Sequence, residues 1–193
     1  NRYTDWGNYY PYWTLRNLWM LSKYVPAERL QVEFLNKWRN QNNYGNDPFA
    51  PSSYSFDYLF AITMAAQPLA FFDAGALPKK AFDQEGLIKR YRTIQHDFHK
   101  GIILPVGDEP SGKSWTGFQS MKEGEGYLLI FRELNSESSV QLKTYLESEA
   151  SVELTPLFGD GKKSKQRVLK SGMISVSLPK KNSYVMYKYK TTK

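Results

Sequence analysis

The chain has 193 residues, of which 41% are hydrophobic and 23% are charged, and its formal net charge is +7. This composition is typical of a folded globular protein with one large or two small domains, and it excludes an intrinsically disordered chain. The absence of cysteine excludes disulfides, thiol catalysis and cysteine-ligated zinc, and no apolar run approaches the roughly 18 residues that a membrane span needs.

Residues 11–24 predict a first helix. Leu15, Leu18 and Trp19 recur with the spacing of one helical face. The helix ends here because the residue before Pro26 is pushed out of the helical region. Pro26 can then open a second helix. The apolar face of this second helix would comprise Leu30, Phe34, Leu35 and Trp38.

A long polar loop follows at residues 40–53, and loops of this length are usually functional or disordered. Residues 53–78 are apolar almost all round, which indicates a buried segment, and Pro68 must break or kink any helix within it. Residues 84–100 predict a last amphipathic helix, for which Gly101 is a good stop. Its apolar face comprises Leu87, Ile88, Tyr91, Ile94 and Phe98.

After Gly101 the periodicity changes from helical to alternating. Ile174, Val176 and Leu178 alternate with serines, as expected of a half-buried strand. Turns that contain glycine or proline separate the strands, so the second half predicts an antiparallel β-sandwich. The predicted strands are residues 102–106, 115–121, 127–133, 140–146, 151–155, 174–178 and 184–189.

The positive charge is concentrated at the end of the chain. Residues 160–193 contain ten lysines and arginines and one acidic residue, which raises the question of a nucleic-acid partner. The basic residues are scattered through predicted turns and along one face of a predicted strand. This spacing favours a solvated surface, so we expect no nucleic-acid partner.

The sequence GDEPSGKS at residues 107–114 matches the phosphate-binding pattern G-x-x-x-x-G-K-[ST]. In such a site backbone N–H groups cradle the phosphates, Lys113 reaches the terminal phosphate and Ser114 binds magnesium. The pattern requires a helix directly after the loop, whereas the following residues predict a strand and a turn. Asp108 and Glu109 would also bring negative charge to an anion site. We therefore interpret the segment as a turn and keep nucleotide binding as an alternative.

The two histidines, His96 and His99, lie one turn apart on the last predicted helix. A zinc site would need a third ligand, and the sequence offers none at a suitable spacing. Neither histidine has a nucleophile motif such as G-x-S-x-G as a partner. We expect no metal, no cofactor and no Ser-His-Asp catalysis.

Carboxylates are the stronger candidates for chemistry, because glycoside hydrolysis requires two of them flanking the scissile bond. Asp5 lies in the aromatic opening segment NRYTDWGNYYPYW, Asp47 lies in the polar loop, and Asp57 begins the buried segment. Aromatic rings beside a carboxylate suit the apolar face and the hydroxyls of a sugar. The residue types alone favour a simpler interpretation, in which the aromatics form the core, Asp5 flanks a helix and Asp47 forms a turn.

Two longer stretches favour the sugar interpretation. Asn46-Asp47-Pro48, together with AITMAAQPLAF at residues 61–71, resembles the late-barrel region of the α-galactosidase (melibiase) clan of glycoside hydrolases. In that clan a last barrel helix and an antiparallel C-terminal sandwich follow. The resemblance implies an α+β chain, with a helical remnant of the end of a (β/α)8 barrel in residues 1–100 and a β-sandwich in residues 101–193.

The resemblance also implies roles for single residues. Arg2-Tyr3-Thr4-Asp5 is similar to the clan's arginine-then-aspartate segment after the sixth barrel strand, where the aspartate is the acid/base of a retaining enzyme. Asp5 would therefore be catalytic, with Arg2, Trp6 and Asp47 on the substrate side. The nucleophilic aspartate would lie on an earlier barrel strand, which this chain does not contain.

On this interpretation the chain is the C-terminal portion of an enzyme for α-galactoside-like substrates, inactive alone, whose partner is the remaining barrel. The implied location is extracytoplasmic. Two alternatives stay open: a free-standing carbohydrate-binding or interaction module, and the nucleotide-binding loop.

Overall fold

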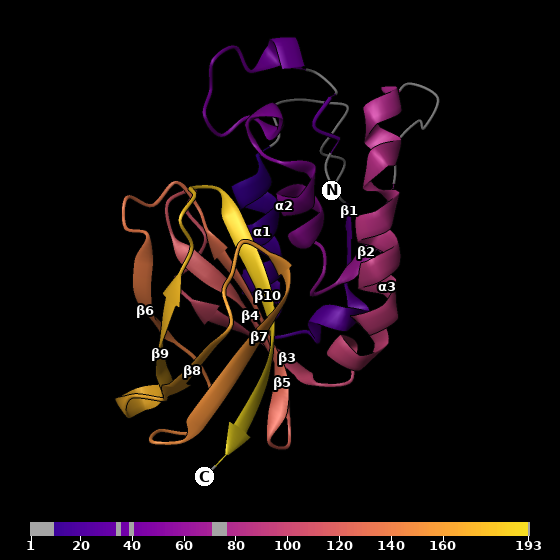
Figure 1. Cartoon of the computed structure of the whole chain (residues 1–193). Helices are drawn as coiled ribbons and strands as arrows, with labels where there is room; N and C mark the ends of the chain where they lie inside the picture. Colours follow the sequence, from indigo (N-terminus) through magenta and orange to yellow (C-terminus); the bar gives the residue numbers. More distant parts are fainter. Residues whose placement is uncertain (1–9, 34–35, 39–40, 71–76, 193) are drawn as a thin grey trace.

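The computed structural model of the chain describes residues 10–33, 36–38, 41–70 and 77–192. Its helices lie on one side of a large antiparallel sheet, and a small two-stranded sheet lies on the other side (Figure 1). The helices are α1 (Pro11–Leu21), α2 (Phe56–Ala61) and α3 (Glu85–His99), and short 3-10 turns lie at Ala27–Arg29, Gln41–Asn43, Pro51–Ser53, Lys79–Gln84 and Lys170–Gly172. None of the helices in the described ranges is long and apolar enough to cross a membrane.

The large sheet has six antiparallel strands in the order β3-β4-β5-β10-β7-β8, and β6 pairs with β9 in the second layer. The predicted strands are confirmed, with small shifts at their ends. The prediction omitted one short strand, β8, because its residues are polar and it lies at the edge of the sheet. The bounds are β3 (Ile102–Gly107), β4 (Trp115–Lys122), β5 (Glu125–Arg132), β6 (Ser139–Lys143), β7 (Ser151–Gly159), β8 (Ser164–Arg167), β9 (Met173–Ser177) and β10 (Ser183–Thr192).

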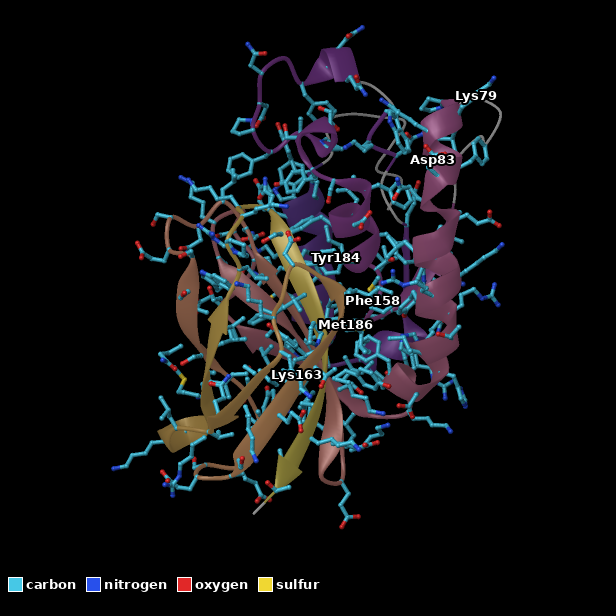
Figure 2. All side chains as sticks on the ribbon, viewed as in Figure 1. Lys79, Asp83, Phe158, Lys163, Tyr184 and Met186 are labelled. Carbon is cyan, nitrogen blue, oxygen red and sulfur yellow. The ribbon has the colours of Figure 1, made fainter. Side chains whose placement is uncertain are left out.

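The central strand β5 is buried on both faces, and its side chains alternate between two hydrophobic cores. Leu128 and Ile130 point toward the β6–β9 layer, and Leu129 and Phe131 point toward the helices. Neighbouring strands contribute to the helix-facing core in the same way. Figure 2 labels three of these side chains between the sheet and the helices, Phe158, Tyr184 and Met186.

The helix predicted from Pro26 is wrong. The chain makes a single 3-10 turn and then the strand β1 (Gln31–Glu33), which pairs in parallel with β2 (Gln67–Leu69). The amide of Gln67 donates a 2.8 Å hydrogen bond to the carbonyl of Leu30, so pairing with a distant segment overrides the local helical spacing. Of the predicted helical face, Phe34 and Leu35 lie outside the described residues.

The other helical predictions are confirmed. The predicted buried segment contains α2, which ends at Ala61, and Pro68 lies in β2 rather than in a helix. Burial is confirmed for most of residues 54–66, whereas Leu69 is 37% exposed and residues 71–76 lie outside the described residues. The side-chain Oγ of Ser55 accepts a 3.2 Å hydrogen bond from the amide of Tyr58 and thereby caps α2. In α3, Tyr91 and Phe98 are buried against the rest of the helix-facing core, as the apolar spacing predicted.

Candidate functional site

The Asp47 loop, residues 41–54, follows the C-terminal end of β1 and folds into consecutive turns. Asp47 shapes these turns itself, because its Oδ1 accepts a 2.9 Å hydrogen bond from the amide of Phe49 and its backbone carbonyl accepts a 3.1 Å bond from the amide of Ala50. This is the side-chain-to-backbone geometry that aspartate favours in turns. The turn-forming role that the sequence suggested for Asp47 is therefore confirmed.

The second carboxylate oxygen of Asp47 faces the start of α1. Tyr10 donates a 2.8 Å hydrogen bond from its hydroxyl to Asp47 Oδ2. Both oxygens therefore have a donor, and each retains a lone pair for a further one. A half-buried carboxylate held in this way is suited to orienting a hydroxyl group more than to transferring protons.

Aromatic side chains surround this carboxylate. The ring of Tyr10 makes an edge contact with Trp13 at 4.7 Å between centroids, and the ring of Tyr12 contacts Phe49 at 5.4 Å. We call these residues, together with Tyr44 at 5.8 Å from Tyr10, the aromatic cluster. Trp13 is 42% exposed, so the cluster offers an aromatic surface to solvent beside a carboxylate.

The sequence-predicted site residues fall into three groups. Asp47 is hydrogen-bonded to Tyr10 and Phe49 of the aromatic cluster. Arg2, Asp5 and Trp6 lie outside the described residues, and their predicted roles stay predictions. Asp57 lies elsewhere, exposed in the first turn of α2, where a negative charge stabilises the helix N-terminus.

The segment at residues 107–114 forms the loop between β3 and β4, as the turn interpretation predicted. The backbone N–H groups that would cradle a phosphate are directed to a buried carboxylate instead. Glu133 is 1% exposed, and its Oε2 accepts hydrogen bonds from the amides of Ser111 at 3.0 Å and Ser114 at 2.8 Å. Burial raises the pKa of Glu133, and the hydrogen bonds from Ser114 and Ser111 oppose that rise. Strand β4 follows the loop directly, so the loop does not lead into the helix that the pattern requires, and nucleotide binding is not supported.

The two histidines differ in their surroundings. His96 is exposed, whereas His99 is half-buried between α3 and β2. Nε2 of His99 lies 3.0 Å from the carbonyl oxygen of Met64, and Nδ1 lies 3.3 Å from Nε2 of Gln67. Because a carbonyl only accepts, Nε2 carries the proton, and Nδ1 accepts from the Gln67 amide. Within the described ranges no group of three histidine, aspartate or glutamate side chains could hold a metal ion.

Acidification is expected to destabilise the chain through His99. Burial lowers its pKa below the ordinary value of 6.5, so the unfolded chain binds the proton more readily and stability falls as the pH drops below that value. We expect His99→Gln to lose less free energy of unfolding than the wild type between pH 7.5 and 5.5, measured by urea denaturation. The exposed His96→Gln is the comparison and should lose nearly as much as the wild type, because it keeps the buried His99; the loss should be slightly smaller, since the charge of His96 also lowers the His99 pKa. An equal pH dependence in all three proteins would contradict the assignment.

No family profile and no curated protein matches the sequence. Among solved structures, the galactosidase domain of an α-galactosidase–sucrose kinase aligns over 94% of this chain with a TM-score of 0.66 and 11% sequence identity. A GH36 α-galactosidase from Geobacillus stearothermophilus, in complex with 1-deoxygalactonojirimycin, aligns over 85% with a TM-score of 0.54 and 14% identity. An Anoxybacillus α-amylase aligns over 95% with a TM-score of 0.55 and 13% identity.

The chain spans 25%, 22% and 45% of these three structures, respectively. At these identities the comparison establishes a shared fold. The resemblance to the α-galactosidase clan, which the sequence suggested from its Asn46-Asp47-Pro48 and AITMAAQPLAF segments, is therefore confirmed at the level of the fold.

Proposed function

We propose that this chain is the C-terminal part of a retaining glycoside hydrolase for α-galactoside-like substrates, and that it is inactive without the rest of the catalytic barrel. The observation that carries the proposal is the parallel pairing of β1 with β2. The chain runs from β1 through α2 to β2 and then α3, and alternating parallel strands and helices are the repeating unit of a (β/α)8 barrel. The shared fold with two α-galactosidase structures supports this interpretation.

The position of the aromatic cluster fits this proposal. Active sites of such barrels lie at the C-terminal ends of the parallel strands. The Asp47 loop follows that end of β1 in the sequence, and its carboxylate accepts a hydrogen bond from Tyr10 of the aromatic cluster. Asp47 would accept hydrogen bonds from sugar hydroxyls, while Arg2 and Trp6 would lie nearby on the substrate side.

Catalysis itself would need groups from outside the described residues. Asp5 would protonate the leaving glycosidic oxygen and later remove a proton from the attacking water. The nucleophilic carboxylate would come from an earlier strand of the barrel. The large sheet would cover the exposed apolar faces of the barrel helices, as its shared core with α2 and α3 suggests.

The native polypeptide provides the test. An antibody raised against this chain should detect, in the source cells, a polypeptide large enough to hold a whole barrel of about 250 residues. After immunoprecipitation that polypeptide should hydrolyse an aryl α-galactoside, whereas this chain alone should not. A band at the mass of this chain alone, or turnover by the purified chain, would contradict the proposal.

A free-standing carbohydrate-binding module is the second candidate. The observation that favours it is the exposure of Tyr24 at 82% and Tyr145 at 52%, because exposed tyrosine rings can stack on sugars. Both tyrosines line hollows beside β3 that share Lys23 and Leu104. In the same experiment this candidate predicts a native band of the chain's own mass and galactan affinity of the chain alone.

A further inference from the structure

We propose that the loop at residues 107–114 positions the Asp47 loop through the contact of Gly112 with the ring of Phe49. The buried side chain of Glu133 holds the 107–114 loop in place for this contact. The phosphate-loop pattern then reflects a contact between the two halves of the chain rather than a nucleotide site. The meaning of this contact for substrate binding rests on the proposed function. The contact itself does not.

Glu133 fixes the loop from inside the sheet. Its carboxylate binds the amides of Ser111 and Ser114, as described above. The amide of Leu134, the next residue, donates a 2.9 Å hydrogen bond to the carbonyl of Gly112. Residues directly after β5 therefore hold both a carbonyl and two amides of the loop, which leaves its backbone little freedom.

The same side-chain network closes the loop at its base. The hydroxyl of Ser114 donates a 2.7 Å hydrogen bond to the carbonyl of Glu109, and Asn135 Nδ2 donates a 2.7 Å bond to the carbonyl of Lys113. Because Glu133 is buried directly after β5, its hydrogen bonds attach the loop to the six-stranded sheet. It is thus a rigid support for whatever packs on it.

What packs on it is the ring of Phe49. Gly112 has a φ of +86°, and a Cβ atom placed on it would lie 2.5 Å from Cε1 of Phe49. The three nearest heavy atoms to that position all belong to the Phe49 ring, so the ring lies directly on the glycine backbone. Any larger residue would push the ring away and would also strain the backbone.

Phe49 transmits the contact to Asp47. Its amide donates the 2.9 Å hydrogen bond to Asp47 Oδ1, and its ring contacts Tyr12 in the aromatic cluster. A second, exposed connection joins the 107–114 loop to α1, because Arg16 of α1 forms a 2.5 Å ion pair with Glu109. An exposed ion pair contributes little, so we assign the positioning to the Gly112–Phe49 contact.

Hydrogen exchange on this chain tests the proposal without any sugar. The amides of Asp47, Phe49 and Ala50 all donate hydrogen bonds within the Asp47 loop, so their exchange rates report how well the loop is held. We expect Gly112→Ala to accelerate their exchange at least about tenfold. The matched control is Gly124→Ala, because Gly124 also has a positive φ of +68° but has no heavy atom within 4 Å of its Cβ position.

Two further variants separate positioning from a general loss of stability. Glu133→Gln keeps a side-chain oxygen that can accept hydrogen bonds from the amides of Ser111 and Ser114, so the exchange rates in the Asp47 loop should stay within about twofold of the wild type. Glu133→Ala removes this acceptor and should accelerate exchange as much as Gly112→Ala does. If Gly112→Ala does not fold, Phe49→Leu removes the ring from the other side of the contact and should have the same effect.

Equal exchange of the Asp47 loop in Gly112→Ala and Gly124→Ala would overturn the proposal, and so would acceleration by Glu133→Gln as large as by Glu133→Ala. The proposed function has a separate readout, which is α-galactoside hydrolysis by the native polypeptide. If that activity exists, Gly112→Ala should raise KM more than it lowers kcat. If the native polypeptide does not turn over galactosides, the proposed function fails while the exchange result still decides the positioning contact.

Discussion

Asp5→Asn in the native polypeptide is expected to lower kcat for unactivated α-galactosides by about 10²–10⁴-fold, the usual contribution of a general acid/base. The asparagine keeps the shape of the side chain but cannot donate a proton to the leaving oxygen or accept one from water. KM should change much less, because the substituted group acts on protons and not on overall binding. Steady-state kinetics on a galactosyl disaccharide would measure both values.

The type of leaving group gives this prediction its control. A phenolate with a low pKa needs no protonation, so for such a substrate formation of the glycosyl intermediate should be nearly normal and only its hydrolysis should be slow. Azide needs no general base and should restore turnover, giving a galactosyl azide of retained configuration. Asp83→Asn provides a matched variant, since Asp83 is exposed in the turn before α3 (Figure 2). Equal losses of kcat/KM for both substrates, or no rescue by azide, would show that Asp5 is not the acid/base.

Sequence periodicity predicted the elements whose burial pattern is regular. The face of α3 and the alternation in β9 each repeat over several residues, so a local pattern reveals them. Strand β1 has only three residues, and its pairing partner β2 lies in a segment distant in the sequence. Spacing around Pro26 therefore suggested a helix there, whereas the segment is extended because it pairs with β2.

In the candidate site, too, the contacts within a short segment were predictable from the sequence, whereas the contacts between distant segments were not. Asp47 before a proline indicated a turn, and the structure confirms that local role. The hydrogen bond from Tyr10 joins two segments that no spacing connects. Glu133 was hardest to identify, because a glutamate at the end of a strand usually faces solvent. Its hydrogen-bond partners lie in the 107–114 loop. The phosphate-binding pattern of that loop suggested an external phosphate, whereas the anion bound by the loop amides is the carboxylate of Glu133.

Phe98→Ala is expected to reduce the free energy of unfolding by about 3–5 kcal/mol, the usual cost of removing a buried phenylalanine ring. The ring is fully buried and meets Tyr127 of β5 at 5.5 Å between centroids. The backbone carbonyl of Phe98 also accepts a 2.6 Å hydrogen bond from Ser120 Oγ of β4, so the end of α3 is attached to the sheet at this point. Urea denaturation followed by circular dichroism would measure the loss.

The exposed Phe82→Ala is the matched control, and we expect it to stay within about 0.5 kcal/mol of the wild type. The two probes of the experiment also report how the halves unfold. Helical circular dichroism follows α1 and α3. The fluorescence of Trp115 follows the core between the two sheets, and it is measured in a variant in which the other four tryptophans are replaced by phenylalanine. Because the helix-facing core contains residues of both halves, both signals should move together to lower urea in Phe98→Ala. A shift of the helical signal alone would mean that residues 101–193 fold independently, and the sheet would then be a separate domain rather than the support on which the Asp47 loop depends.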